Sequence, residues 1–345
     1  SWTFVFRPSM PRVVVVGAGA AGTMAAIFAA SAGAETLLLE RTKDGGRKIL
    51  ISGGGRCNIL PAQLETSRFV TDSSPHTLRR IVRSWPLDEQ RAFFERDMDL
   101  PLVLERESAK LFPKSQSARD VRDRLLAFAR HKGVTLVTDT LVNDLRPSAK
   151  GWTIALHAGD SLEADAVIVA TGGLSVPSTG SDGWGLRIAE RLGHAMHPTY
   201  AALTPLTKGG RESFSPEAFE NDSRPPFADL SGISLPVTLT ARANGREAHA
   251  SGGFLFTHRG YSGPAVLDVS HVAVRSLDES TPPACITVQW TPLGDQEWDA
   301  ALRARGSRTV LATVAAELPH RLAEALLAHA GIDSGQALSQ LSRPD

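Results

Sequence analysis

The chain has 345 residues, 42% of them hydrophobic, enough for more than one folded domain with a buried core. Its 37 basic and 37 acidic side chains cancel, so no net field favours nucleic acid or an anionic membrane. No apolar run approaches the ~20 residues that span a bilayer. Its two cysteines, Cys57 and Cys285, exclude a disulfide framework, and no Cys/His cluster predicts a metal site. We therefore expect a cytoplasmic protein; the sequence indicates no oligomeric state.

The first ten residues hold a short apolar patch that lacks the charged start, the long apolar run and the cleavage site of a signal peptide. We expect residues 1–10 to be a disordered lead-in, or to precede a start at Met10.

A short strand followed by a glycine-rich turn opens the first folded segment. Four consecutive valines, residues 13–16, predict a strand buried on both faces of a parallel sheet. Gly17, Gly19 and Gly22 then form a Gly-x-Gly-x-x-Gly pattern, which opens into an alanine-rich helical run to Ser31. In a dinucleotide-binding turn the first glycine permits the tight turn and the second leaves no side chain between the backbone and a pyrophosphate. The third lets helix and strand pack closely.

The second predicted strand, residues 36–39, ends in an acid. Gly33 is placed to end the helix before it, and Glu40 comes about twenty residues after the glycine pattern, where a carboxylate accepts hydrogen bonds from adenosine ribose hydroxyls. A glycine-rich turn alone often serves only close packing. Strand, turn, helix, second strand and acid in register predict a dinucleotide site instead, whose further candidate residues are Ala20, Ala21 and Arg41.

A second glycine-rich segment, residues 45–58, is too rich in glycine for a helix. Adjacent glycines let backbone amides approach a ligand closely, and Arg47, Lys48 and Arg56 are candidates for neutralising phosphate charge. A flexible surface loop is the alternative interpretation. Cys57 has no Cys-x-x-Cys partner, so we expect a packed thiol rather than a redox nucleophile. The other cofactor-binding candidates here are Ser52, Gly53, Gly54, Cys57 and Asn58.

Residues 46–58, about two dozen residues after the glycine pattern, resemble the signature of the HI0933-like (BaiN-like) family of FAD-dependent oxidoreductases. The resemblance runs through essentially the whole chain from Pro11, with further motifs at residues 111–115, 170–173, 180–185 and 255–264. It implies an α/β fold: a glutathione-reductase-type FAD-binding Rossmann domain with an inserted β-rich and helical domain. It also implies FAD as the cofactor and a redox reaction on a small organic substrate, with NAD(P)H as a candidate electron donor.

Two short helices are predicted between residues 75 and 98, the second carrying Phe93, Phe94 and Met98 inward. Residues 102–112 alternate as in a hairpin, and residues 117–131 predict an amphipathic crossover helix stopped by Gly133.

Three short strands around residues 134–137, 141–145 and 152–157 predict a β-meander, followed by a closing strand at residues 166–170. This order resembles the FAD domain of glutathione-reductase-type flavoproteins, in which an Ala-Thr-Gly turn packs near the dinucleotide. An ordinary strand end is the alternative. The cofactor-binding candidates at this turn are Ala170, Thr171, Gly172 and Gly173.

A third glycine-rich loop, residues 180–185, precedes a helix predicted at residues 184–192. No apolar strand directly precedes the loop, so it is not a second Rossmann fingerprint, and a nicotinamide cofactor would have no separate domain.

From about Pro198 the residue pattern favours β-strands. Strands are expected around residues 235–241, 253–257 and 286–290, with a hairpin turn at Asn244-Gly245. His258 and Tyr261 lie in a polar cluster that could face the flavin ring, which makes them weak catalytic candidates; a structural histidine in a loop is the alternative.

Residues 295–330 turn helical, with one apolar face formed by Leu311, Val314, Leu318, Leu322, Leu326 and Leu327. Family members continue into a segment with Gly-Gly and Gly-Glu motifs that returns to the FAD domain, and we find no such segment before Asp345. We therefore expect a fragment or a shortened member, with residues 11–195 as the first part of the FAD-binding domain and 196–345 as the insertion. The alternatives are a non-catalytic FAD-binding remnant and a flavin-dependent RNA-modifying protein, although the balanced charge does not suggest the basic face of the latter.

Overall fold

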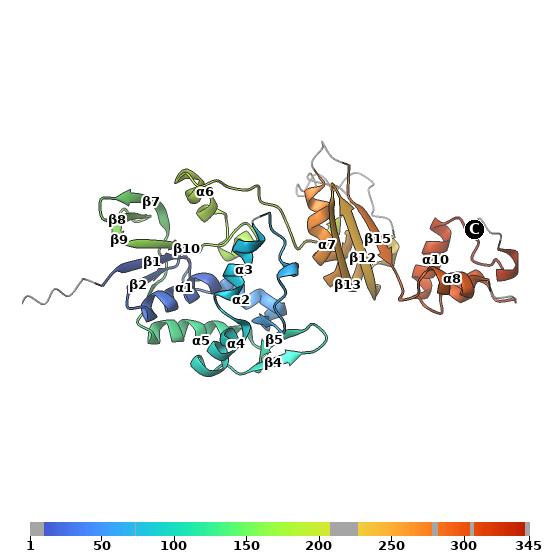
Figure 1. The fold of residues 1–345 in the computed structure, drawn as a ribbon, viewed down its shortest axis with the longest axis horizontal. Helices are drawn as coiled ribbons and strands as arrows, with labels where there is room; N and C mark the ends of the chain where they lie inside the picture. The colour runs from blue at the N-terminus through green and yellow to red at the C-terminus, as the bar shows by residue number, and fades with distance from the viewer. Residues whose placement is uncertain (1–9, 73, 208–226, 278–281, 304–306, 342–345) are drawn as a thin grey trace, which may run out of the picture. The chain divides into compact units, whose positions relative to one another are not determined.

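A computed structural model of the protein describes residues 10–72, 74–207, 227–277, 282–303 and 307–341. The chain divides into two compact units, Ser1–His197 and Pro198–Asp345 (Figure 1). Most of the predicted lead-in, residues 1–9, lies outside the described residues. No described helix is long and apolar enough to cross a membrane.

A four-stranded parallel sheet forms the centre of the first unit, in the order β10-β1-β2-β6. Its strands are β1 (Arg12–Val16), β2 (Glu35–Leu39), β6 (Thr135–Val137) and β10 (Ala166–Val169). The helices α1 (Ala20–Ser31) and α5 (Ala118–His131) lie on one face. The other face carries an antiparallel meander of β7 (Val142–Ser148), β8 (Gly151–Leu156) and β9 (Ser161–Ala164) (Figure 1).

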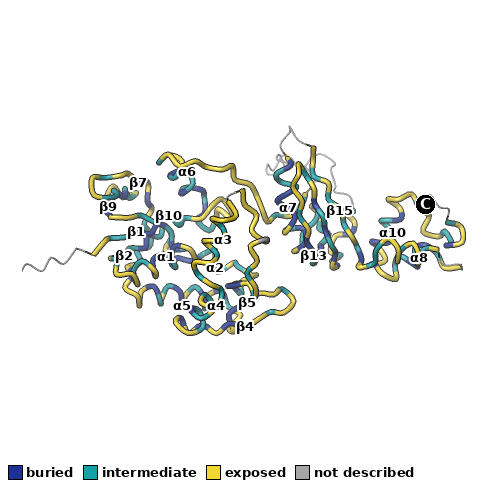
Figure 2. Tube along the Cα trace, viewed as in Figure 1, coloured by how far each residue is buried: buried dark blue, intermediate teal, exposed yellow. Residues whose placement is uncertain are grey.

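Alternation along the central strands explains why they read as unbroken apolar runs. Val15 and Leu38 are buried with the helices α1 and α5, whereas Val14 and Leu39 are buried with the meander. Both faces of the sheet are therefore covered, as in other parallel sheets. Figure 2 shows buried positions on the central strands and on the elements that cover them. The predicted Rossmann-type α/β class is confirmed.

The connection from β2 to α5 holds most of the smaller elements. These are α2 (Arg47–Ile51), β3 (Leu60–Pro61), α3 (Pro75–Arg83), α4 (Leu87–Ala92), β4 (Leu102–Glu105) and β5 (Lys110–Pro113). The two predicted helices and the hairpin are confirmed. Phe93 and Met98 are buried and Phe94 is partly buried, but all three follow the end of α4, with Phe93 and Phe94 in a separate helical segment, Phe93–Asp97.

Two local predictions in this unit are wrong. Helix α2 occupies part of the segment judged too glycine-rich for a helix, because five residues free of glycine follow Gly46, which adopts a left-handed φ of 75°. The strand at 135–137 joins the parallel sheet rather than the meander, and the unpredicted β9 takes its place there. The predicted helix after the third glycine loop is confirmed as α6 (Trp184–Arg191).

The second unit is an antiparallel sheet in the order β11-β14-β13-β12-β15, with helices. Its strands are β11 (Leu206–Thr207), β12 (Ser234–Ala243), β13 (Arg246–Thr257), β14 (Gly260–Ser262) and β15 (Cys285–Gln289). Its helices are α7 (Pro264–Arg275), α8 (Asp295–Leu302), α9 (Val310–Val314) and α10 (His320–His329). Ala243 pairs with Arg246 across the predicted Asn244-Gly245 turn.

The sequence did not predict α7, which begins at Pro264 and buries Val266, Val269 and Val272 against the sheet. The predicted C-terminal apolar face is divided among separate short helices. Leu322 belongs to the core of the sheet, whereas Leu327 belongs to a small cluster with Val310.

Candidate functional site

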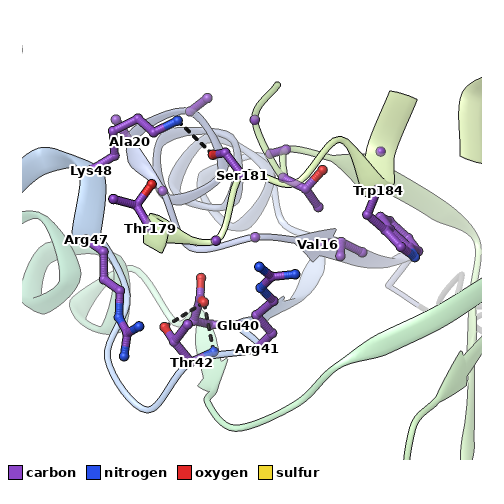
Figure 3. Close-up of a pocket in the computed structure, with 18 of the residues that line it drawn as sticks. Val16, Ala20, Glu40, Arg41, Thr42, Arg47, Lys48, Thr179, Ser181 and Trp184 are labelled. Carbon is purple, nitrogen blue, oxygen red and sulfur yellow. Dashed lines mark hydrogen bonds between the residues drawn. The ribbon is translucent and has the colours of Figure 1, made fainter. Parts of the chain in front are cut away.

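A cavity of about 800 Å³ lies at the carboxyl ends of β1, β2 and β10 (Figure 3). Its size is within the range of ligand pockets, roughly 300–1,000 Å³, and open α/β sheets bind ligands at this end of their strands. Most of the cofactor-binding residues named from the sequence line it: Gly17, Gly19, Ala20, Ala21, Glu40, Arg41, Arg47, Lys48, Ser52, Cys57, Asn58, Ala170, Thr171 and Gly172.

The three glycines of the first turn have different surroundings. A Cβ atom on Gly22 would lie 1.8 Å from the carbonyl oxygen of Gly17, and one on Gly17 would lie 2.7 Å from the carbonyl oxygen of Ala170. A Cβ on Gly19 would meet nothing within 4 Å. Gly17 and Gly22 therefore serve close packing, whereas Gly19 borders open space in the cavity.

Helix α1 presents its N-terminus to the same space. Gly19 is its N-cap residue, and no side chain caps the first turn. The free amide groups of a helix N-terminus and the positive end of its dipole form a natural site for phosphate groups.

The Glu40 carboxylate is held by three donors at the end of β2. It accepts hydrogen bonds from the amide of Ala18 at 2.9 Å, and from the amide of Thr42 at 2.9 Å and the Thr42 hydroxyl at 2.7 Å. Figure 3 shows the two bonds with Thr42. A carboxylate has about four acceptor positions. The acid is thus fixed in position with acceptor capacity left for a ligand, and its contact with ribose stays a prediction.

An ion pair joins the end of β2 to the start of α6. The Nη1 atom of Arg41 donates to Oδ2 of Asp182 at 2.7 Å, and the amide of Trp184 donates to Oδ1 at 3.0 Å. The hydrogen bond from Arg41 lowers the pKa of Asp182, and the amide bond acts in the same direction. Asp182 and Trp184 both line the cavity.

The two cations of α2 already have protein partners. The Lys48 ammonium donates to Oγ of Ser181 at 2.7 Å (Figure 3) and to the carbonyl oxygen of Ser175 at 2.8 Å. Arg47 pairs with Asp44 at 2.9 Å. Both cations line the cavity, so a phosphate there would share them with these partners.

Arg56 does not line the cavity. Its Nη1 atom donates to Glu105 at 2.7 Å, and its guanidinium lies 4.3 Å from the centre of the Phe112 ring. The sequence-based role of Arg56 as a phosphate partner has no support in this geometry. Four other predicted residues also lie outside the cavity lining: Gly22, Gly53, Gly54 and Gly173.

Cys57 lines the cavity but is only 7% exposed. Burial raises the pKa of its thiol, and a hydrogen bond with Ser52 only partly opposes that shift. A raised pKa disfavours the thiolate, which is the reactive form. The geometry therefore supports the packed thiol expected from the sequence.

Thr171 supplies a polar atom that lacks a partner. Its Oγ1 is buried and has no hydrogen-bond partner among the described residues, and Thr171 lines the cavity. A buried hydroxyl without a partner costs free energy unless a ligand or water satisfies it. An unfilled glycine face, a helix N-terminus, a fixed acid and a free hydroxyl together fit an adenine dinucleotide such as FAD.

The sequence does not predict several further residues that line the cavity. They include Thr42, Thr140, Leu141, Val142, Thr179, Gly180, Ser181, Asp182 and Trp184. The glycine-rich pattern at residues 180–185 is the local signal that marks part of this set.

The weak catalytic candidates belong to the second unit, whose placement relative to the cavity is not determined. His258 is exposed. The ring of Tyr261 lies 5.4 Å from that of Phe254 and 5.8 Å from that of Phe256, and burial raises its pKa. Tyr261 therefore packs on the core of the sheet, and a catalytic role for either residue stays untested. No group of side chains that could hold a metal ion occurs among the described residues.

Asp144 ties α6, which lines the cavity, to the meander. Its carboxylate accepts hydrogen bonds from Arg191, the last residue of α6, and from Arg146, which together lower its pKa to about 2. This stabilisation is complete above the unfolded-state pKa of 3.8 and disappears as the pH falls through about 2. We expect Asp144→Asn to lower the free energy of unfolding by about 1 kcal/mol at pH 6, because the variant loses both ion pairs. The effect is small because the two arginine side chains are exposed, so solvent screens their charges.

The difference between wild type and Asp144→Asn should shrink as the pH falls from 4 to 3. Urea unfolding of both proteins at pH 6, 4 and 3 measures it, with Asp160→Asn, an exposed acid of the same unit, as the control. A difference that is independent of pH would contradict an electrostatic tie.

Comparison with known proteins places this geometry in a family. Residues 11–319 match the family described as HI0933-like protein Rossmann domain. The chain is 29% identical over 315 residues to the ribosomal RNA dihydrouridine synthase of Escherichia coli, covering 91% of this chain and 72% of that protein. It is 31% identical over 274 residues to the 3-dehydro-bile acid delta(4,6)-reductase of Clostridium scindens, covering 78% of this chain and 62% of that protein.

Among solved structures, the 3-ketosteroid-delta4-(5alpha)-dehydrogenase of Rhodococcus jostii RHA1 is 18% identical. It superposes with a TM-score of 0.37, over 50% of this chain and 48% of that one.

Proposed function

We propose that this chain, which belongs to the HI0933-like family, is an FAD-dependent oxidoreductase that acts on a small organic substrate with a reduced nicotinamide as electron donor. The observation that carries the proposal is the bare face of Gly19, which borders open space beside Glu40 at the carboxyl end of the parallel sheet. The two free cysteines are consistent with our proposal of a reducing, cytoplasmic location.

The residues of the cavity bind and orient the cofactor. FAD, when bound, supplies the redox chemistry, and the protein supplies position and electrostatics. The N-terminus of α1 would hold the pyrophosphate, Glu40 the adenosine ribose, and the Thr171 hydroxyl a polar group of the same ligand.

The names of the relatives narrow the class of substrate. A dihydrouridine is a uridine whose ring carbon–carbon double bond has been reduced, and the bile acid enzyme of Clostridium scindens is named as a reductase of double bonds in a 3-dehydro, that is 3-oxo, compound. Both reactions add hydrogen to a carbon–carbon double bond conjugated with a carbonyl. We propose that this chain reduces such a bond.

A purified sample tests the proposal directly. The protein should be yellow or become so with added FAD, and a 3-oxo steroid carrying the conjugated double bond should reoxidise the flavin after its reduction by NADPH or NADH without oxygen. A colourless folded protein that does not bind FAD would support the alternative of a non-catalytic remnant.

A second candidate function is the reduction of uridine in RNA, favoured by the extent of the match to the Escherichia coli protein. A uridine-containing oligonucleotide replaces the steroid in the same assay. If the oligonucleotide reoxidises the flavin and the steroid does not, the substrate is RNA rather than a small molecule.

Cys57→Ser should leave the rate of flavin reduction by NADPH within about tenfold of wild type, a barrier change of about 1.4 kcal/mol. The thiol is buried with a raised pKa, so it contributes no nucleophile. Stopped-flow absorbance measures the rate, and Cys285→Ser, at the exposed cysteine, is the matched control. A loss much larger than tenfold at Cys57 alone would make it a catalytic thiol.

A further inference from the structure

Helix α3 carries three arginines and a histidine along one side. His76, Arg79, Arg80 and Arg83 follow an i, i+3, i+4, i+7 spacing, which places them on one face of an α-helix. All four are exposed, and α3 itself contains no acid, although Glu65, Asp72, Asp88 and Glu89 stand in the flanking segments. We call this arginine-bearing face the α3 stripe.

The arginines of the α3 stripe differ from most arginines of the same unit with respect to their partners. Arg79 donates to the carbonyl oxygen of Pro75 and lies 3.4 Å from Nδ1 of His76, and no described carboxylate pairs with Arg79, Arg80 or Arg83. Elsewhere in the unit arginines form ion pairs with acids: Arg12 with Glu35, Arg41 with Asp182, Arg47 with Asp44, Arg56 with Glu105, and Arg124 with Asp120. The stripe is thus available to an external anion.

The orientation of α3 selects among anionic partners. Leu78 and Val82 lie on the face opposite the stripe and are partly buried, whereas Ile81 on that face is 62% exposed. The arginines of the helix face the solvent. A helix that lies in a membrane would instead need its apolar face free to enter the lipid. One exposed apolar side chain does not form such a face, so the exposed arginines suit a polyanion in solution. Figure 2 shows most of α3 as exposed.

The chemistry of the stripe points to nucleic acid, and its surroundings to a single strand. Guanidinium groups bind phosphate through two parallel hydrogen bonds, and the stripe carries arginine but no lysine. The turn at Thr66–Arg68 contacts α3, and Phe69, which follows it, is 44% exposed. The segment thus carries exposed arginines on α3 and an exposed aromatic ring six residues before it. Surfaces that hold single-stranded RNA typically combine cationic side chains with aromatic rings on which bases stack.

We infer that the α3 stripe is a docking surface for single-stranded RNA. The inference goes beyond the proposed function, because α3 contributes no residue to the lining of the cavity and RNA can bind there whatever the flavin reduces. A substrate carried on RNA would use this surface for its strand.

Fluorescence anisotropy with a labelled, uridine-rich 12-nucleotide RNA tests the inference on the whole chain. The triple variant Arg79→Gln, Arg80→Gln, Arg83→Gln should bind the RNA at least tenfold more weakly than wild type at 50 mM salt. The slope of log affinity against log salt concentration should be shallower by about 2 in the triple variant. Each phosphate contact on a single strand contributes about 0.7 to this slope, and three contacts are lost.

The matched control replaces Arg96, Arg106 and Arg130 by glutamine, because these arginines are also exposed and no described acid pairs with them. It removes the same charge and should retain wild-type RNA affinity. Both triple variants should bind FAD as wild type does, which separates this test from that of the proposed function. Equal losses of RNA affinity in the two variants, or no RNA binding by wild type, would overturn the inference. So would tighter binding to a DNA duplex or to phosphatidylglycerol vesicles than to the RNA.

Discussion

Gly19→Val is expected to abolish FAD binding while the chain stays folded. A Cβ atom at Gly19 meets nothing within 4 Å, so the branched side chain enters open space in the cavity rather than the protein. There it would occupy the volume where a pyrophosphate approaches the N-terminus of α1. We expect the affinity for FAD to fall at least a hundredfold, about 2.7 kcal/mol. Flavin absorbance and circular dichroism measure the two effects separately.

The contrast with Gly22 is the control for this prediction. A side chain at Gly22 collides with the carbonyl oxygen of Gly17, so Gly22→Ala should reduce folding stability as well as FAD binding. Gly33→Ala, at a glycine after α1 with no neighbour within 4 Å of its Cβ position, should retain FAD despite the strain of its φ of 90°. Flavin retained by Gly19→Val would mean that the turn is only structural.

The sequence predicted the elements whose signals are local. Residues 13–16 are apolar because both faces of β1 are covered, and the alternation of Val14 and Val15 between two cores confirms the reason. The N-cap of α5, Ser117, accepts a hydrogen bond from the amide of Asp120, and Gly133 follows the last turn with a φ of 88°. Caps and periodicity lie within a few residues of each other, so they can be predicted from sequence.

Contacts between distant segments of the chain could not be predicted in this way. Lys48 binds Ser175 and Ser181, more than a hundred residues later, so its role as a bridge to that loop has no local signal. The charge of Arg56 predicts a phosphate partner, but Glu105 and Phe112 fix its position. The glycine content of residues 45–58 argues against a helix, yet the five residues of α2 contain no glycine.

Glu40 shows where local and distant effects combine. The sequence placed an acid at the end of β2, and the structure shows its carboxylate bound to the amide of Ala18 in the glycine turn and to Thr42. The acid therefore has two functions to separate: it holds the turn, and it is predicted to bind ribose. A substitution of Thr42 separates the two functions of Glu40. It removes a hydrogen bond that fixes the carboxylate but leaves the negative charge of Glu40 in place.

Glu40→Ala is expected to weaken FAD binding by about 1–3 kcal/mol, which is roughly fivefold to 150-fold, through loss of charge-assisted hydrogen bonds to ribose. Thr42→Val should cause a smaller loss, because the carboxylate remains but one of its donors is gone. Glu35→Ala, at an exposed acid of the same strand that pairs with Arg12, is the matched control and should bind FAD as wild type does.

Fluorescence titration with FAD and with FMN, which lacks the adenosine, distinguishes the two functions of Glu40. If the acid binds ribose, Glu40→Ala loses affinity for FAD but not for FMN, and the preference of the protein for FAD shrinks by the same factor. Thermal unfolding of the flavin-free variants reports the loss of the contacts to Ala18 and Thr42 independently. An unchanged dissociation constant for FAD in Glu40→Ala, together with a lowered midpoint of unfolding, would show that the acid only organises the turn, because a ribose contact cannot be removed without a change in FAD affinity.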